Sequence, residues 1–138
     1  MSSDELAIRA ANDGFYHAFS ARDLPAMEAI WARDVPVACI HPGWDALRTR
    51  EEVIDSWRRI LSNDRSPRVS CAEVTVHAHG AMAFVVCHER VGGAELVATN
   101  VFIRQEGAWK LTHHQAAPFA EAWADRTKTP QSDPRELN

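Results

Sequence analysis

The first half of the chain carries apolar residues at helical spacing. Residues 4–20 are predicted to form a helix, with Ser3 or Asp4 available as its N-cap. Its apolar positions recur close to every 3.6 residues, and they are Leu6, Ile8, Ala11, Phe15 and Phe19. One face of this helix is therefore expected to be buried against the rest of the protein.

Two more helices and a short strand are predicted before residue 63. Asp23 is the expected N-cap of a short second helix, because a proline follows it at a position that favours the first helical turn. Residues 36–40 read as a short strand that ends in a Pro-Gly turn. Thr49 and Glu52 form a capping box, which predicts a third helix over residues 49–62.

After Pro67 the apolar period changes from 3.6 to 2, which is typical of strands. Glycines mark turns near residues 80, 92–93 and 106–107, at plausible hairpin positions. Four strands are therefore expected between these turns, over residues 69–76, 82–91, 96–104 and 109–116.

This order of elements predicts a two-layer α+β domain over residues 1–118, with three N-terminal helices packed on a curved antiparallel sheet. A sheet that bends around a helix leaves a cavity between the layers, where small ligands usually bind. Residues 119–138 lose the periodicity and contain two prolines, so we expect a C-terminal extension that is partly flexible.

Composition narrows the functional class. The 138 residues have a formal net charge of −4, which argues against a nucleic-acid partner. We find neither an apolar stretch of about 18 residues, which a membrane span needs, nor the pattern of a signal peptide at the N-terminus. The three cysteines form no CxxC pair, so we expect reduced thiols in a cytoplasmic protein rather than a zinc site.

Three stretches resemble a known superfamily. They are FYHAFSARDLPAMEAIW, CIHPGWDALRTREEVIDSWRRI and VATNVFIRQEGAWKLTHHQAAP, and the resemblance covers about residues 5–118. They are similar to the NTF2-like superfamily, specifically its SnoaL-like branch and the association domain of the calmodulin-dependent kinase. The resemblance implies a cone-shaped (cystatin-like) roll, a fold that carries isomerases, cyclases, dehydratases and proteins without catalytic activity.

The superfamily's steroid isomerase provides a comparison of site residues. Its oxyanion hole consists of a tyrosine and a protonated aspartate, and an aspartate acts as its base. The resemblance places these positions on Phe15, on Asn100, and on Cys39 or His41. No carboxylate remains at any of them, so steroid isomerase chemistry is not expected. In the kinase relative the last strand carries a second histidine, and that position is Gln115 here.

Strand alternation predicts which side chains point into the cavity. With Asn100 facing inward, the polar inward residues are Glu89, Asn100, His113 and Gln115, joined by His41 or Cys39 from the short strand. The expected apolar lining is Phe15, Phe19, Trp31, Trp57, Cys87 and Phe102. An alternative is that the aromatic residues of the helices are simply core.

His113 is the predicted proton-transfer residue, because an imidazole titrates near neutral pH. Glu89 would orient its ring and Asn100 would polarise a carbonyl group of the ligand. We expect the carboxylate of Glu89 to raise the pKa of His113 by more than burial lowers it. The alternative is that these three residues form a satisfied structural network without catalysis.

Neither a metal nor another cofactor is expected. Adjacent strand residues point to opposite faces, so His113 and His114 cannot share one ion within the sheet. His77 and His79 share a face but bring no third ligand in sequence.

Two functions fit these patterns. One is a domain that binds a small apolar or aromatic ligand, with the activity of an isomerase, cyclase or dehydratase on a carbonyl compound. The other is a non-catalytic module for ligand binding or association.

A homodimer through the convex face of the sheet is also predicted. The residues expected on that face are mostly apolar, and they are Val86, Val97, Thr99, Val101 and Ile103. An apolar patch of this kind usually marks an association site. The alternative is that the C-terminal extension folds over this face.

Overall fold

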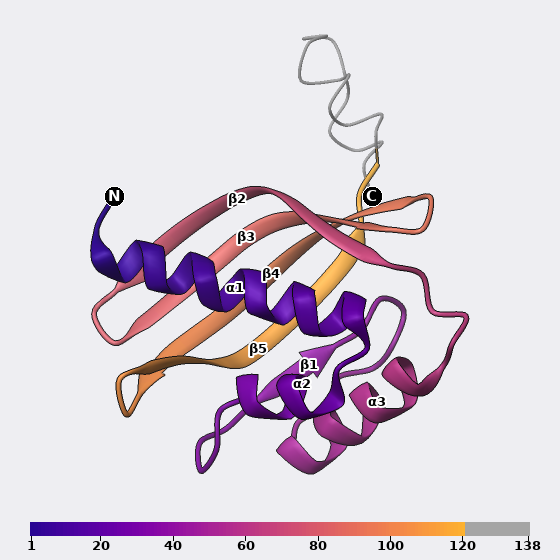
Figure 1. Ribbon diagram of the computed structural model, residues 1–138, viewed down its shortest axis with the longest axis horizontal. Helices are drawn as coiled ribbons and strands as arrows, with labels where there is room; N and C mark the ends of the chain where they lie inside the picture. Colours follow the sequence, from indigo (N-terminus) through magenta and orange to yellow (C-terminus); the bar gives the residue numbers. More distant parts are fainter. Residues whose placement is uncertain (121–138) are drawn as a thin grey trace, which may run out of the picture.

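The computed structural model describes residues 1–120, which form three helices and one five-stranded sheet (Figure 1). The helices are α1 (Ser3–Ala21), α2 (Leu24–Ile30) and α3 (Arg50–Ser62). The strands are β1 (Ala38–Ile40), β2 (Val69–His79), β3 (Met82–Val91), β4 (Ala94–Gln105) and β5 (Ala108–Pro118). The predicted α+β class and order of elements are confirmed. The expected extension over residues 119–138 lies almost entirely outside the described residues.

The helices begin where side chains can satisfy free backbone N–H groups. Ser2 caps α1, one residue before the predicted cap, and accepts a hydrogen bond from the Glu5 backbone at 3.1 Å. Asp23 caps α2 as predicted. Thr49 caps α3 as predicted, since its Oγ1 accepts from the backbone N–H of Glu52 at 3.1 Å, and the Glu52 carboxylate accepts from the Thr49 hydroxyl at 2.9 Å.

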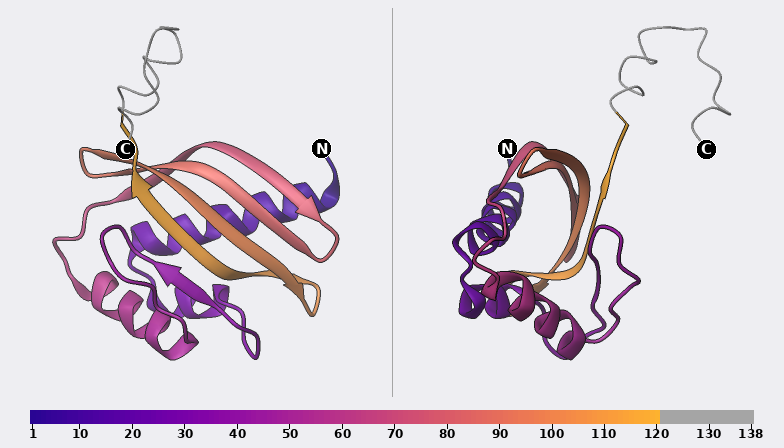
Figure 2. Two further views of the ribbon diagram at one scale, coloured as in Figure 1. Left: turned by 180° about the vertical axis from the view of Figure 1, so that it is seen from behind. Right: turned by 90° about the vertical axis from the view of Figure 1, so that its right-hand side faces the viewer.

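The sheet has the strand order β1-β5-β4-β3-β2, in which β1 is parallel to β5 and all other pairs are antiparallel. The β4–β5 turn carries Glu106 and Gly107 at φ of 51° and 80°, which are the positive values that a tight twisted hairpin requires. The sheet curls around α1, and β1 with α2 and α3 lies at one end of the roll (Figure 2).

The concave face of the sheet packs against the helices. Phe15, Trp31 and Trp57 are at most 1% exposed and lie in the core between the two layers. The predicted inward faces of β3 and β4 are confirmed, because their alternate residues are buried: Ala83, Val85, Cys87, Glu89, Ala98, Asn100 and Phe102. The apolar positions of the sequence therefore form the interior of the cone.

A β-bulge changes the predicted face of β5. Val101 pairs with His113 while Phe102 pairs with Leu111, so Thr112 is an extra residue that has no partner on β4. A bulge inserts one residue and reverses the alternation beyond it. The prediction that His113 and Gln115 point inward is therefore wrong.

His114 and Ala116 are the buried residues after the bulge, at 1% and 2% exposure. His113 is half-buried on the opposite face, and Gln115 is exposed.

Within residues 1–120, no helix is long and apolar enough to cross a bilayer.

Candidate functional site

A pocket of about 270 Å³ opens at the end of the cone where β1 and α3 meet the sheet. Its lining is mostly apolar, with three titratable side chains, and consists of Phe19, His41, Pro42, Trp44, Ile60, Glu89, Val91, Leu96 and His114. Among residues 1–120, neither lysine nor arginine contributes to this lining. A pocket just under about 300 Å³ suits a small, largely apolar molecule.

The structure brings together only some of the predicted lining residues. Phe19 and His41 line the pocket, and Trp44 lies at its rim with 44% of its surface exposed. The others are packed in the core behind the pocket: Phe15, Trp31, Cys39, Trp57, Cys87 and Phe102. Gln115 is on the outer face and cannot line the cavity.

Asn100 is the centre of a buried hydrogen-bond network. Its Nδ2 donates to Asn12 Oδ1 at 2.9 Å and to the Tyr16 hydroxyl at 3.1 Å, which uses both amide hydrogens. Its Oδ1 therefore accepts from His114 Nδ1 at 2.5 Å. The ring proton of His114 is therefore on Nδ1, and Nε2 of the neutral ring keeps its lone pair. Asn100 has no hydrogen left to polarise a ligand carbonyl, which corrects the predicted role.

Tyr16 is a site residue that the sequence analysis missed. Its hydroxyl donates to Glu89 Oε2 at 2.6 Å and lies 3.3 Å from Cys87 Sγ. The position expected to carry the tyrosine, Phe15, instead packs edge-on against Tyr16 and Trp57. Burial first, and the charge of Glu89 second, raise the pKa of Tyr16, so its hydroxyl keeps its proton and remains a donor.

A signal for Tyr16 is present in the sequence. Tyr16 is the one tyrosine of the chain, and it follows Asn12 at the i,i+4 spacing that places two residues on the same helix face. Two polar residues at that spacing within an apolar stripe indicate a buried polar cluster. Both side chains are at most 4% exposed.

Glu89 and His114 form the chemically active pair of the pocket. His114 Nε2 lies 3.8 Å from Glu89 Oε2, and both side chains are 2% exposed. Burial raises the pKa of Glu89 above its ordinary value of 4.5 and lowers the pKa of His114 to about 3. Both shifts favour a protonated carboxyl group beside a neutral imidazole rather than an ion pair.

His113 does not have the predicted environment. It lies on the other face of the sheet from Glu89, and burial lowers its pKa rather than a carboxylate raising it. The expected rise in pKa is therefore wrong. Its neighbour His114 has the expected position beside Glu89 and Asn100.

Two groups at the pocket end of β1 have different chemical character. His41 is 4% exposed and stacks edge-on against Trp44 and Trp57, with ring centroids 4.8 and 4.9 Å apart. Burial raises the pKa of Cys39 to about 12, so its thiol is protonated at neutral pH and is a poor nucleophile.

In the described part of the chain, no group of three or more potential ligands could hold a metal ion.

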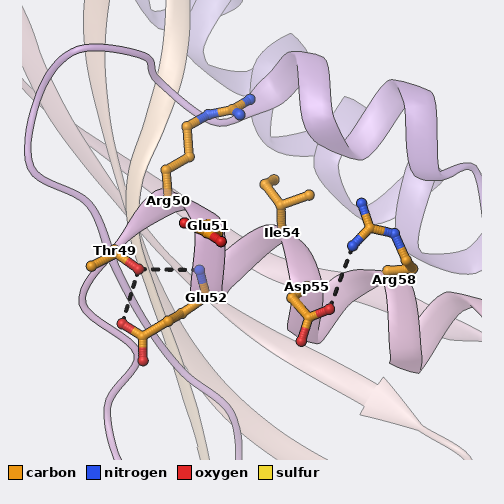
Figure 3. Close-up of a pocket in the computed structure, with 7 residues that line it drawn as sticks. All are labelled: Thr49, Arg50, Glu51, Glu52, Ile54, Asp55 and Arg58. Atoms are coloured by element: carbon orange, nitrogen blue, oxygen red, sulfur yellow. Dashed lines mark hydrogen bonds and ion pairs between the residues drawn. The ribbon is translucent and has the colours of Figure 1, made fainter.

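A second hollow, of about 650 Å³, lies on the surface of α3 and is lined by the charged residues of its first turns (Figure 3). Most of its polar side chains have partners within the protein: Glu52 bonds Thr49, and Arg58 contacts Asp55 at 3.4 Å. Arg50 donates to the carbonyl groups of Glu28 and Ala32, at the C-terminal end of α2. These are structural interactions, and the pocket at the cone mouth remains the candidate site.

The fold and the site define a class of protein: a cone-shaped α+β roll with a small apolar pocket that ends in buried titratable groups. The profile of the SnoaL-like domain matches residues 8–129. The chain therefore belongs to the SnoaL-like family, a branch of the NTF2-like proteins, which confirms the predicted resemblance.

Solved structures similar to the chain include two of at least 30% sequence identity. One, from Streptomyces avermitilis, is provisionally assigned as an NTF2-like dehydratase; it is 30% identical with a TM-score of 0.78, over 85% of this chain and 97% of that one. The other, from Thiobacillus denitrificans, is provisionally assigned as a calcium/calmodulin-dependent protein kinase type II association domain. It is 32% identical with a TM-score of 0.73, over 81% and 94% of the two chains.

A curated relative is the F-box protein SKIP8 of Arabidopsis thaliana, which is 28% identical over 113 residues. The match covers 80% of this chain and 49% of the relative, so the chain spans about half the length of that protein.

Proposed function

We propose that this domain binds a small, uncharged, largely apolar carbonyl compound in the cone mouth and transfers a proton on it through Glu89 and His114. The observation that carries this proposal is the position of the pair, buried in the lining of a mostly apolar pocket. Buried titratable groups with shifted pKa values in a pocket are typical of catalytic acids and bases.

The neutral state of the pair suits this role. A protonated Glu89 can donate to an oxygen of the ligand, and the free Nε2 of a neutral His114 can accept a proton from a carbon or a hydroxyl group. Dehydration and isomerisation both remove one proton and deliver another, so the family and the relative assigned as a dehydratase support this class of reaction. Asn100 and Tyr16 act as positioning residues, because their hydrogen bonds hold the ring and the carboxyl group.

The test measures proton exchange on a simple ketone. Acetophenone dissolved in D₂O with the protein should lose its methyl proton signal by NMR faster than without the protein. His114→Gln and Glu89→Gln should each reduce this protein-dependent rate by about 100-fold or more, the usual contribution of a general acid or base.

His113→Gln is the matched control, because it changes the neighbouring histidine on the outer face. Its exchange rate should equal that of the unchanged protein. Equal loss in the His113→Gln and His114→Gln variants, or no effect of either, would contradict the assignment. No binding of neutral ketones by calorimetry would contradict the pocket's function altogether.

A second candidate function is a non-catalytic ligand-binding or association module. It is favoured by the satisfied hydrogen bonds of Asn100 and by the relative assigned as an association domain. Ketone binding without proton exchange in the unchanged protein would favour this alternative.

We also propose a homodimer through the convex face of the sheet. Met82 and Val97 lie on this face with 41% and 36% of their surfaces exposed, beside the half-buried Val86, Val101 and Ile103. A second copy would cover this apolar surface. Sedimentation at micromolar concentration should show a dimer, and Val97→Glu should shift it to a monomer because a charge would be buried.

The control for this substitution is Leu6→Glu, which changes an exposed apolar residue of α1. That variant should sediment like the unchanged protein. A monomer in the unchanged protein would exclude the dimer.

The free thiols of Cys39, Cys71 and Cys87 support a reducing compartment such as the cytoplasm.

A further inference from the structure

His41 is the third titratable residue of the pocket and has no role in the proton transfer described above. It follows the last residue of β1, and both its ring and that of His114 lie near Trp57, at centroid distances of 4.9 and 6.1 Å. The two histidines are thus neighbours in the same apolar pocket. What His41 can offer a ligand depends on which of its ring nitrogens carries the proton.

Ser56 determines that proton's position. Ser56 Oγ lies 2.6 Å from the carbonyl oxygen of Val53 and 2.9 Å from His41 Nε2. A carbonyl oxygen has no hydrogen, so the one hydroxyl proton of Ser56 must lie on the bond to Val53. The hydroxyl oxygen then accepts from His41, which places the ring proton on Nε2.

The other nitrogen of His41 is consequently an acceptor. Within residues 1–120, the polar atom near Nδ1 is the weak partner Cys39 Sγ at 4.0 Å, and this sulfur lies closer to Nε2, at 3.7 Å. Burial lowers the pKa of His41 to about 4, so the ring is neutral at pH 7 and Nδ1 keeps its lone pair. The groups that surround this ring are Ser56, Cys39, Trp44, Trp57 and His114.

We propose that Ser56 holds His41 as a hydrogen-bond acceptor of the pocket, which makes the pocket selective for uncharged hydroxy-carbonyl compounds. The hydroxyl group of such a ligand donates to His41 Nδ1, while its carbonyl oxygen accepts from Glu89. The preference rests on the proposed function, since it assumes that the same pocket binds a carbonyl compound. Ser56 is a positioning residue and does not touch the ligand.

Histidine NMR tests the positioning without any ligand. In protein with ¹⁵N-labelled histidine at pH 7, His41 should appear as a neutral ring protonated at Nε2 alone. Ser56→Ala should convert it to a mixture of the two tautomers, because the acceptor for Nε2–H is lost. Ser62→Ala is the matched control: Ser62 is exposed on the same helix and bonds a backbone carbonyl in the same way, so its removal should leave His41 unchanged. A ring protonated at Nδ1 in the unchanged protein would overturn the proposal.

Two probes test the selectivity. Calorimetry should show that 4-hydroxyacetophenone binds about tenfold more tightly than 4-methoxyacetophenone, which lacks the donor; this is the contribution of one hydrogen bond. Ser56→Ala should remove most of the preference, Ser62→Ala none of it, and His41→Leu all of it. His41→Leu also serves if Ser56→Ala does not fold.

Equal binding of the two probes to the unchanged protein would overturn the selectivity. A preference for the hydroxyl compound without proton exchange would leave the selectivity standing and reject catalysis. Failure of both probes to bind, with His41 protonated at Nε2, would reject the proposed function and the selectivity with it, leaving only the positioning by Ser56.

Discussion

His41 and His114 together are expected to lower the free energy of unfolding by about 5 kcal/mol between pH 6.5 and pH 4, at about 1.4 kcal/mol per pH unit for each proton taken up on unfolding. The folded protein keeps His41 and His114 neutral, with pKa values of about 4 and about 3 against an ordinary value of 6.5. The unfolded chain binds these protons below pH 6.5 and the folded protein does not. The stabilising contribution is therefore present above pH 6.5 and is lost as the pH falls.

Glu89 has the opposite sign. Its raised pKa means that the folded protein keeps a proton that the unfolded chain releases above pH 4.5, so its contribution is lost as the pH rises. Between pH 4.5 and the pKa of Glu89 in the folded protein, the change in stability due to Glu89 cancels that due to one of the two histidines. Half-buried His113, whose pKa is also lowered, adds a smaller contribution in the same direction as the other histidines.

Urea unfolding at a series of pH values checks these signs. His114→Gln and His41→Gln should each flatten the loss of stability on acidification, and Glu89→Gln should steepen it. A slope that none of these substitutions changes would show that the three groups titrate alike in the folded and unfolded chains.

Asn100→Leu is expected to cost about 2–6 kcal/mol of stability. Leucine has a similar volume but removes an amide that is completely buried and fully bonded. Two groups lose their partners, Asn12 Oδ1 and the Nδ1–H of His114, and each buried group left unsatisfied costs about 1–3 kcal/mol. Because Asn100 also sets the tautomer of His114, protein-dependent ketone exchange should fall with stability.

The matched control is Thr99→Val, at the neighbouring position on the opposite face of β4. Substitutions outside buried networks usually change stability by less than about 0.5 kcal/mol. Chemical denaturation of the two variants gives the comparison. A loss for Asn100→Leu no larger than that of Thr99→Val would contradict the network as a source of stability.

The sequence by itself determined the elements and the layers of this fold. Caps at Asp23 and Thr49 and the change of period after Pro67 are local signals, because the backbone groups and alternating faces that they specify belong to a few neighbouring residues. The same alternation correctly oriented Glu89 and Asn100, since β3 and β4 pair with each other without a register shift. The family followed from the same stretches.

Only the tertiary structure decided which histidine joins that pair. The bulge at Thr112 arises where β5 pairs with β4 on one side and with β1 on the other, and nothing in the sequence near residues 109–116 marks the extra residue. Because side chains alternate along a strand, this one insertion exchanged His113 for His114 in the cavity. The tautomers of His41 and His114 likewise depend on Ser56 and Asn100, which folding brings close from other elements of the chain.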